Sequence, residues 1–258
     1  MLNITISQQD LETFFLVLVR ISSFVTVAPF FGESSVPARY KLGFAVALSY
    51  LVYLIIPDAT LPYDTTLGYA TLIVKESVVG LLVGFSAFIC NTIVLFAGRI
   101  IDMDIGLSMA NLYDPTTREQ VSLTGSFYQR TIMILFILSG MHLYLLGAIV
   151  DTFTLIPIGG LSINMILYNS FTGFLTDYFI IGFRIILPVF AVTLIVNCAM
   201  GIMTKIAPQI HMFSVGMQIK ILVGLLVLFM TIILLPNLAD YLFDEMKIMI
   251  AEVIRGMS

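Results

Sequence analysis

Three charged side chains that lie within apolar stretches are the residues best placed to do chemistry. Arg20, Glu76 and Arg184 each sit among mainly aliphatic and aromatic residues. A charge at the centre of a membrane helix costs roughly 2.5–3.5 kcal/mol on insertion scales, so each needs a partner or water. They could form an ion or proton pathway, or fixed ion pairs. Because a proton relay needs several carboxylates at depth and only Glu76 qualifies, we favour structural ion pairs inside an assembly.

Motifs for enzymatic catalysis are absent from the sequence. It contains neither HExxH nor GxxxxGK[ST], and His142 and His211 are its only histidines. Ser139 and His142 are three residues apart, and we expect them on one helix, where a catalytic hydrogen bond is seldom possible. His142 is more typical of a hydrogen bond between helices. The chain is therefore predicted not to be an enzyme and to need no cofactor.

Two neighbouring carboxylates, Asp102 and Asp104, raise the question of a cation site. Residues two apart on a helix point to different sides, so the two cannot easily share an ion. Hydrogen bonds to nearby helix ends are favoured over metal ligation, and no metal site is predicted.

A long polar stretch, Arg99 to Arg130, interrupts the apolar sequence and holds seven charged residues. Its part from Gly106 to Pro115 is predicted to be irregular, because Gly106 permits unusual backbone angles and Asp114-Pro115 is a stop signal. Thr116 and Glu119 form a capping box for a short helix that follows. Long ordered loops are usually functional.

The composition predicts a polytopic membrane protein. The chain is 59% hydrophobic and 11% charged, with a mean hydropathy of +1.05, whereas soluble domains have roughly 25% charged residues. A net charge of −4 argues against nucleic-acid binding. Cys90 and Cys198 are interpreted as inert buried thiols.

About six apolar helices are predicted. The segments are Thr13 to Ala28, Leu42 to Ile56, Ser77 to Gly98 with a helical lead-in from Thr66, Thr131 to Val150, Tyr178 to Met203 and Ile221 to Leu235. The second and sixth fall short of the roughly 20 residues that a lone spanning helix needs, so protein neighbours could cover them. Lys and Arg gather in the first, third and fifth loops, which predicts that these face the cytoplasm.

The last stretch, Asn237 to Met257, has the pattern of an amphipathic helix. Two interpretations stay open: a helix lying on the membrane surface, or a docking helix for a partner subunit.

A set of residues along almost the whole chain resembles one family. The carriers are Arg20, Pro29-Phe30-Phe31-Gly32, Pro37, Arg39, Glu76, Gly80, Gly84, Gly98, Asp102, Gly106, Asp114-Pro115, Gly140, His142, Asp151, Pro157 and Pro208-Gln209-Ile210-His211-Met212-Phe213. In this order and spacing they resemble FliR, the flagellar export-gate protein, and its virulence-secretion counterpart. Ile210, His211 and Met212 depart from the family's Pro-Gln-Met-Asn-Val-Phe.

The resemblance implies an all-α membrane protein of tilted hairpins that forms part of a helical export gate. Such a subunit assembles with FliP and FliQ, with FlhB around the closed gate and FlhA beneath it, in the bacterial inner membrane at the flagellar basal body. Residues 1–170 would be FliP-like and residues 171–258 a FliQ-like hairpin. Unfolded flagellar proteins would pass through the channel.

The resemblance also implies a plug loop, mapped onto Gly106 to about Gly125. The candidate plug residues are Gly106, Leu107, Ser108, Met109, Asn111, Leu112, Tyr113, Asp114 and Pro115. The candidates for holding subunits together are Arg20, Glu76, Asp102, Arg184, Lys205, Pro208 and Gln209.

Two alternatives remain from the sequence. One is the virulence-secretion homologue, which differs in cargo. The other is a stand-alone small-solute transporter, which would favour matching helix breaks in two halves, whereas only Pro188 offers a break.

Overall fold

The computed structural model describes residues 8–33, 35–56, 61, 63, 65–108, 122–207 and 212–258, without the side chains of 212–214. All regular structure in these ranges is helical, which confirms the predicted all-α class. The helices are α1 (Gln8–Val27), α2 (Ala38–Tyr53), α3 (Thr66–Ile105), α5 (Leu123–Leu138), α6 (Met141–Leu155), α7 (Met165–Ile206), α8 (Met212–Thr231), the 3₁₀ helix η1 (Ile232–Leu234) and α9 (Leu235–Met257).

Several helices are far longer than a bilayer requires. With 40 and 42 residues, α3 and α7 are each about 60 Å long at 1.5 Å per residue. The hydrocarbon core of a bilayer is about 30 Å thick. Three helices in the described part of the chain are long and apolar enough to cross it: Thr66–Ile105, Met165–Ile206 and Val215–Met257, or up to four if α5 and α6 form one bent span.

The fourth predicted segment, Thr131 to Val150, is not one helix. It divides into α5 and α6, which meet at an angle of 70°. Gly140 stands at the break with a φ of +73°, a conformation that suits glycine because it lacks a Cβ. The expectation that Ser139 and His142 share a helix is therefore wrong, since Ser139 ends α5 and His142 lies in α6.

The sixth predicted segment does not stop at Pro236. The chain continues from α8 through η1 into α9, and Pro236 stands in the first turn of α9. A proline is tolerated there because the first helical N–H groups have no partner within the helix.

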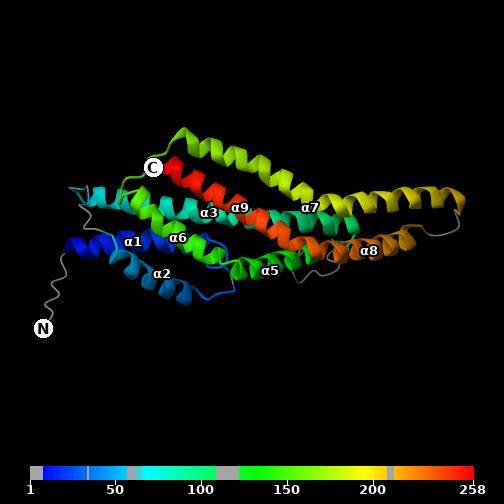
Figure 1. Cartoon of the computed structure of the whole chain (residues 1–258), viewed down its shortest axis with the longest axis horizontal. Helices are drawn as coiled ribbons and strands as arrows, with labels where there is room; N and C mark the ends of the chain where they lie inside the picture. Colours follow the sequence, from blue (N-terminus) through cyan, green and yellow to red (C-terminus); the bar gives the residue numbers. More distant parts are fainter. Residues whose placement is uncertain are drawn as a thin grey trace. The chain divides into compact units, whose positions relative to one another are not determined.

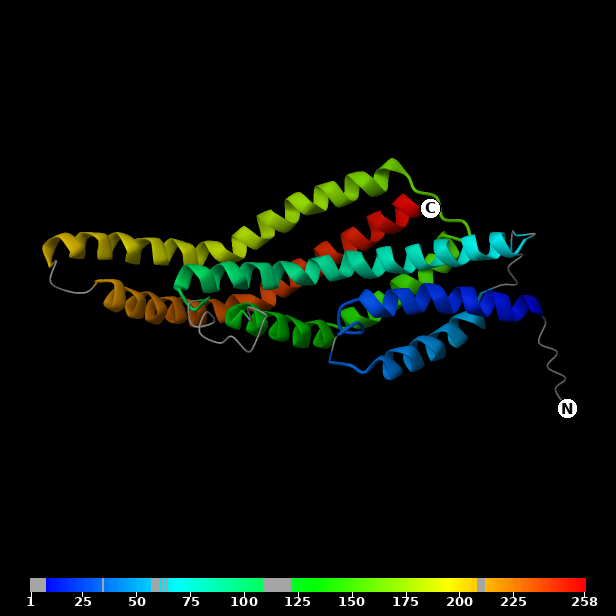
Figure 2. The same cartoon turned by 180° about the vertical axis from the view of Figure 1, so that it is seen from behind.

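The helices gather into two compact units, which we describe separately. The first comprises residues 1–90, 140–174 and 243–258. Within it α1 and α2 form an antiparallel hairpin, and α3 follows along α1 (Figure 1). The second comprises residues 91–139 and 175–242, and in it α7 and α8 form a hairpin (Figure 2). The division into 1–170 and 171–258 comes from the family resemblance. It concerns similarity to other gate subunits, so the two compact units do not test it, and it stays a prediction.

The amphipathic pattern of the C-terminal stretch is confirmed, but its apolar face is covered by the chain itself. Met249 and Val253 are buried, whereas Asp244 and Glu252 are exposed. In the first unit, a Cβ on Gly256 would lie 2.8 Å from the backbone of Leu167. The apolar face is therefore free neither for the membrane surface nor for a partner.

Candidate functional site

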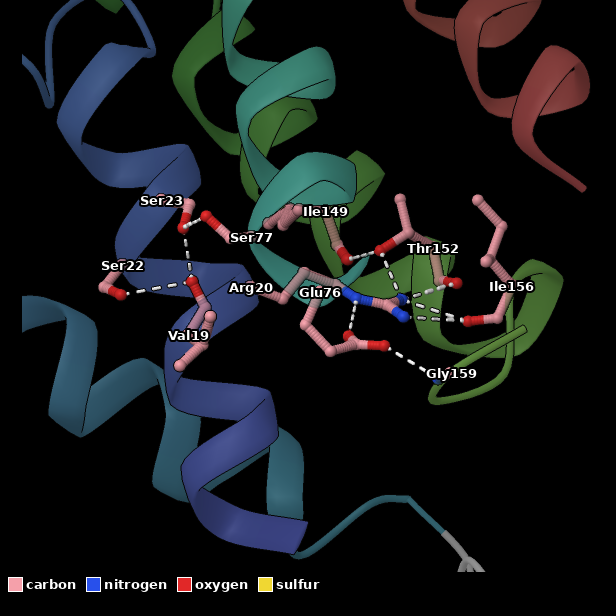
Figure 3. Close-up of polar contacts among 10 residues, drawn as sticks. All are labelled: Val19, Arg20, Ser22, Ser23, Glu76, Ser77, Ile149, Thr152, Ile156 and Gly159. Atoms are coloured by element: carbon pink, nitrogen blue, oxygen red, sulfur yellow. Dashed lines mark hydrogen bonds and ion pairs between the residues drawn. The ribbon is translucent and has the colours of Figure 1, made fainter. Parts of the chain in front are cut away.

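The first unit is built around a buried ion pair between α1 and α3. The Nε atom of Arg20 lies 2.6 Å from Oε2 of Glu76, and the side chains are 0% and 1% exposed. Arg20 Nη1 also donates to the carbonyl of Thr152 at 3.0 Å, and both terminal nitrogens donate to Ile156 O at 3.1 Å (Figure 3). Thr152 O also accepts from Ile156 N at 2.8 Å, whereas Ile156 is the C-cap residue of α6 and its carbonyl has no helical donor. Arg20 therefore caps the C-terminal end of α6 through Ile156 O.

The other oxygen of Glu76 reaches the loop that follows α6. Glu76 Oε1 accepts from Gly159 N at 2.8 Å, and Lys75 Nζ donates to Gly159 O at 2.9 Å. The φ of +78° at Gly159 favours glycine. The Arg20 guanidinium also lies 4.2 Å from the centre of the Phe153 ring. The pair thus joins α1, α3, α6 and the loop after α6 within one chain.

Small residues bring α1 and α3 close enough for this ion pair. A Cβ on Gly80 would lie 2.1 Å from Arg20 O, and one on Gly84 would lie 3.0 Å from Phe24 O. Ser23 Oγ donates to Ser77 Oγ at 3.2 Å across the same contact. Two glycines four apart are a common device for close helix packing in membranes.

In the second unit, Asp102 binds the beginning of α5. Its carboxylate accepts from Ser122 Oγ at 2.7 Å and from Thr124 N at 3.2 Å. Ser122 Oγ in turn accepts from Gly125 N at 2.8 Å, as an N-cap residue does. This confirms the prediction that Asp102 forms hydrogen bonds with a nearby helix end. A Cβ on Gly98 would lie 2.2 Å from Gly125 Cα, so α3 and α5 touch backbone to backbone.

Asp104 points to other helices, as predicted from its spacing to Asp102. Its Oδ1 lies 3.4 Å from Lys220 Nζ in α8, and Thr193 Oγ1 in α7 donates to its Oδ2. The two carboxylates together fix the last turn of α3 to α5, α7 and α8. Gly106 follows at once with a φ of +96°. The predicted plug loop therefore starts from a firmly held point.

The remaining candidates divide into described and undescribed residues. Gly106, Leu107 and Ser108 are described, and Lys205 is exposed near the end of α7. Outside the described residues lie Met109, Asn111, Leu112, Tyr113, Asp114, Pro115, Pro208 and Gln209. The capping box of Thr116 and Glu119 also lies outside them, whereas Ser122 is the N-cap that the structure describes for α5.

Arg184 differs from the other two charges inside apolar segments. It is exposed, and no residue in the described ranges supplies it with an ion pair or a hydrogen bond. Contacts with other subunits stay a prediction for Arg20, Glu76, Asp102, Arg184 and Lys205. Three of these, Arg20, Glu76 and Asp102, already have partners inside the chain.

No group of side chains in the described ranges could hold a metal ion. The Nδ1 atom of His142 is buried without a hydrogen-bond partner, and its ring lies 6.2 Å from that of Phe30, so the expected helix-to-helix hydrogen bond is not seen at that atom. Cys90 is buried as expected, but the expectation is wrong for Cys198, which is exposed.

Sequence reasoning missed several residues of these clusters. Thr152, Gly159, Thr193 and Lys220 come from segments far from their partners in the sequence. Only Ser122 carried a local signal, as a serine just before a helix.

Comparison with known proteins shows the family to which this chain belongs. The model of the family described as bacterial export proteins, family 1, matches residues 11–246. The chain belongs to this family. Flagellar biosynthetic protein FliR of Bacillus subtilis (strain 168) is 35% identical over 223 residues, which cover 83% of this chain and 84% of that protein.

Two further relatives carry the same name. Flagellar biosynthetic protein FliR of Pectobacterium carotovorum subsp. carotovorum is 29% identical over 248 residues, covering 95% of this chain and 94% of the relative. That of Escherichia coli (strain K12) is 28% identical over 244 residues, covering 95% and 93%. The resemblance to FliR is thereby confirmed. The chain is a membrane protein of the flagellar biosynthesis and export family, and these names refer to no catalysed reaction.

Proposed function

We propose that this protein is a subunit of the flagellar type III export gate. With FliP and FliQ it forms the channel for unfolded flagellar proteins, in the bacterial inner membrane at the flagellar basal body. FlhB surrounds the closed gate, and FlhA lies beneath it. The proposal rests on membership of the export family and on the apolar faces that a single chain leaves uncovered.

Those uncovered faces carry the proposal. In the most apolar 18-residue stretch of α7, only 28% is buried within the chain. The corresponding share is 17% in Val215–Met257 and 56% in α3. Large exposed side chains on α7, α8 and η1 include Phe183, Phe190, Ile195, Leu222, Phe229 and Ile233. Lipid can cover only about 30 Å of helices about 60 Å long, so neighbouring subunits must cover the rest.

The resemblance divides the chain into two parts with different roles in the gate. Residues 1–170 act as a FliP-like part and residues 171–258 as a FliQ-like hairpin. The antiparallel course of α7 and α8 supports such a hairpin (Figure 2).

The plug is assigned to the stretch from Gly106 to about Gly125, of which Leu123 to Gly125 already belong to the first turn of α5. Leu107, Met109, Leu112 and Tyr113 are proposed to make the seal, while Gly106 and Pro115 shape the loop. The attachment of its base through Asp102 and Asp104 supports a loop that keeps its position in the closed gate. Replacing 106–115 with a Gly/Ser linker should leave assembly intact and make the membrane leaky to ions. An intact gate without a leak would refute the plug.

Photocrosslinking tests whether other subunits cover the exposed faces. A benzophenone amino acid at Phe229, which is 75% exposed, should form adducts with FliP or FliQ in cells. The same label at Phe153, which is 8% exposed, is the matched control and should form no adduct with another protein. Adducts with lipid alone at both Phe190 and Phe229 would refute the proposed gate contacts.

A further inference from the structure

The turn of α7 from Arg184 to Pro188 carries polar groups without described partners in an apolar surface. The guanidinium of Arg184 is exposed and unpaired within the described ranges. Its neighbours on the helix surface, Ile180, Phe183 and Leu187, are 44%, 54% and 56% exposed. An unpaired arginine in such a setting is costly unless an anion or water meets it.

The backbone at the same turn adds a second polar group. Pro188 has no N–H, so the carbonyl of Arg184, four residues earlier, lacks its usual helical donor. Figure 2 shows α7 changing direction along its length, as a proline inside a helix permits. One turn of the helix thus presents five N–H donors and a free acceptor.

A narrow apolar groove lies beside this turn, within the second unit. Its cavity volume is about 260 Å³. Its walls come from α5, α7 and the η1–α9 junction, and include Tyr128, Ile181, Ile185, Leu234 and Leu238. Tyr128 and Thr231 satisfy each other through a hydroxyl contact of 3.1 Å, so they need no ligand.

We propose that this groove binds one acyl chain of an anionic phospholipid, whose phosphate is held by Arg184. A guanidinium binds phosphate oxygens through paired hydrogen bonds, which a carbonyl or water cannot match in strength. The groove is too small for a helix, whose diameter is about 10 Å, but suits a single hydrocarbon chain. This binding needs the turn from Arg184 to Pro188 to face lipid, so it can fail while the gate contacts proposed for Phe190 and Phe229 hold.

Lipid retention measured by native mass spectrometry tests this assignment. The full-length protein, purified in detergent with its co-expressed subunits, is equilibrated with phosphatidylglycerol or with phosphatidylcholine, and retained lipid is counted. The wild type should retain phosphatidylglycerol selectively. R184Q should reduce its retention at least tenfold. R130Q, which changes another exposed arginine of the same unit, should leave it unchanged.

Two further variants keep the test decisive if R184Q folds poorly. L234W alters a side chain that lines the groove and is 55% exposed, so it should fill the groove, reduce lipid retention and leave folding intact. R184K keeps the charge but loses the paired hydrogen bonds, and should retain an intermediate amount of lipid.

Three outcomes would overturn the proposal. One is equal retention of both lipids by the wild type. Another is retention by R184Q and L234W that matches the wild type. The third is loss of a co-purified subunit in R184Q with unchanged lipid retention, which would assign Arg184 to a carboxylate of a protein partner instead.

Discussion

Arg20 and Glu76 are 56 residues apart in the sequence, yet their side chains form one fully buried ion pair, with 2.6 Å between Nε and Oε2. Around it, the carbonyls of Thr152 and Ile156 and the N–H of Gly159 complete a closed set of hydrogen bonds. Each of these polar groups has lost its hydration by burial and depends on its partner in the set for compensation. Removing one member therefore leaves another buried and unpaired.

Removing one side of this pair should destabilise the protein strongly. R20L leaves Glu76 charged and buried and strips the end of α6 of its cap, so we expect a loss of about 3–5 kcal/mol in the free energy of unfolding. E76Q should destabilise by a similar amount, because its amide oxygen can accept from Gly159 N only if its NH2 group faces Arg20 Nε, and the buried guanidinium loses its counter-ion. Denaturant unfolding in detergent, followed by circular dichroism, measures both.

The double variant R20L/E76L separates ion pairing from packing. It should be less destabilised than the sum of R20L and E76L, because it leaves no buried charge without a partner. Strict additivity of the two losses would contradict the assigned coupling.

Gly80 should tolerate no side chain. In G80A the new Cβ would meet the backbone oxygen of Arg20, so α1 and α3 must separate, and we expect a loss of about 1–3 kcal/mol as for overpacked cores. Gly147 in α6 is the matched control, since a Cβ there meets nothing within 4 Å. G147A should be stabilising by about 1 kcal/mol from helix propensity alone. Equal effects of the two variants on Tm would contradict the close packing.

Several of these features could be predicted from the sequence, because they depend on neighbours along the chain. Helix type, apolar stretches, the lead-in from Thr66 and the opposite directions of Asp102 and Asp104 all follow from helical periodicity. The pairing of Arg20 with Glu76 could not be predicted, since the cost of a buried charge shows that a partner is needed but does not identify it.

The bend at Gly140 was missed for a related reason. Its flanks are apolar enough to read as one continuous span, and a single glycine is tolerated within helices. The sequence does not show that α5 and α6 belong to different compact units, with Gly140 at the boundary between them. The exposure of Cys198 depends likewise on which face of α7 the rest of the chain covers, and composition carries no such information.

Asp102 should control the beginning of α5. In D102N the amide oxygen can take the place of Oδ2 and accept from Ser122 and Thr124, but the negative charge at the beginning of α5 is lost. We therefore expect a loss of about 0.3–1 kcal/mol and faster hydrogen exchange at the first turn of α5. D151N changes an exposed carboxylate on α6 and should leave both quantities as in the wild type. If exchange in α5 were the same in D102N and D151N, the capping role would be refuted.

A carboxylate at the start of α1 should give stability a small dependence on pH. The Tyr63 hydroxyl donates to Glu12, which lowers the pKa of that carboxyl below its usual value and raises the pKa of Tyr63. A lowered carboxyl pKa stabilises the fold above its unfolded pKa, and this is lost as pH falls through the folded value. Y63F should therefore lower Tm slightly at neutral pH, with the difference vanishing in acid.

Tyr69 supplies the control for this dependence. Its hydroxyl donates to the backbone oxygen of Glu12 at 3.2 Å rather than to the carboxylate. Y69F should shift Tm by the same amount at neutral and acidic pH. A loss in Y63F that persists unchanged in acid would show that Glu12 does not titrate in this contact.

The most direct test of the export function is secretion from a deletion strain. The gene is removed, and hook and filament proteins are measured in the medium with and without a copy of the intact gene. The proposed gate function predicts that both proteins disappear from the medium and return with the intact copy. Normal hook and filament secretion in the deletion strain would contradict it, whether or not any virulence effectors were lost.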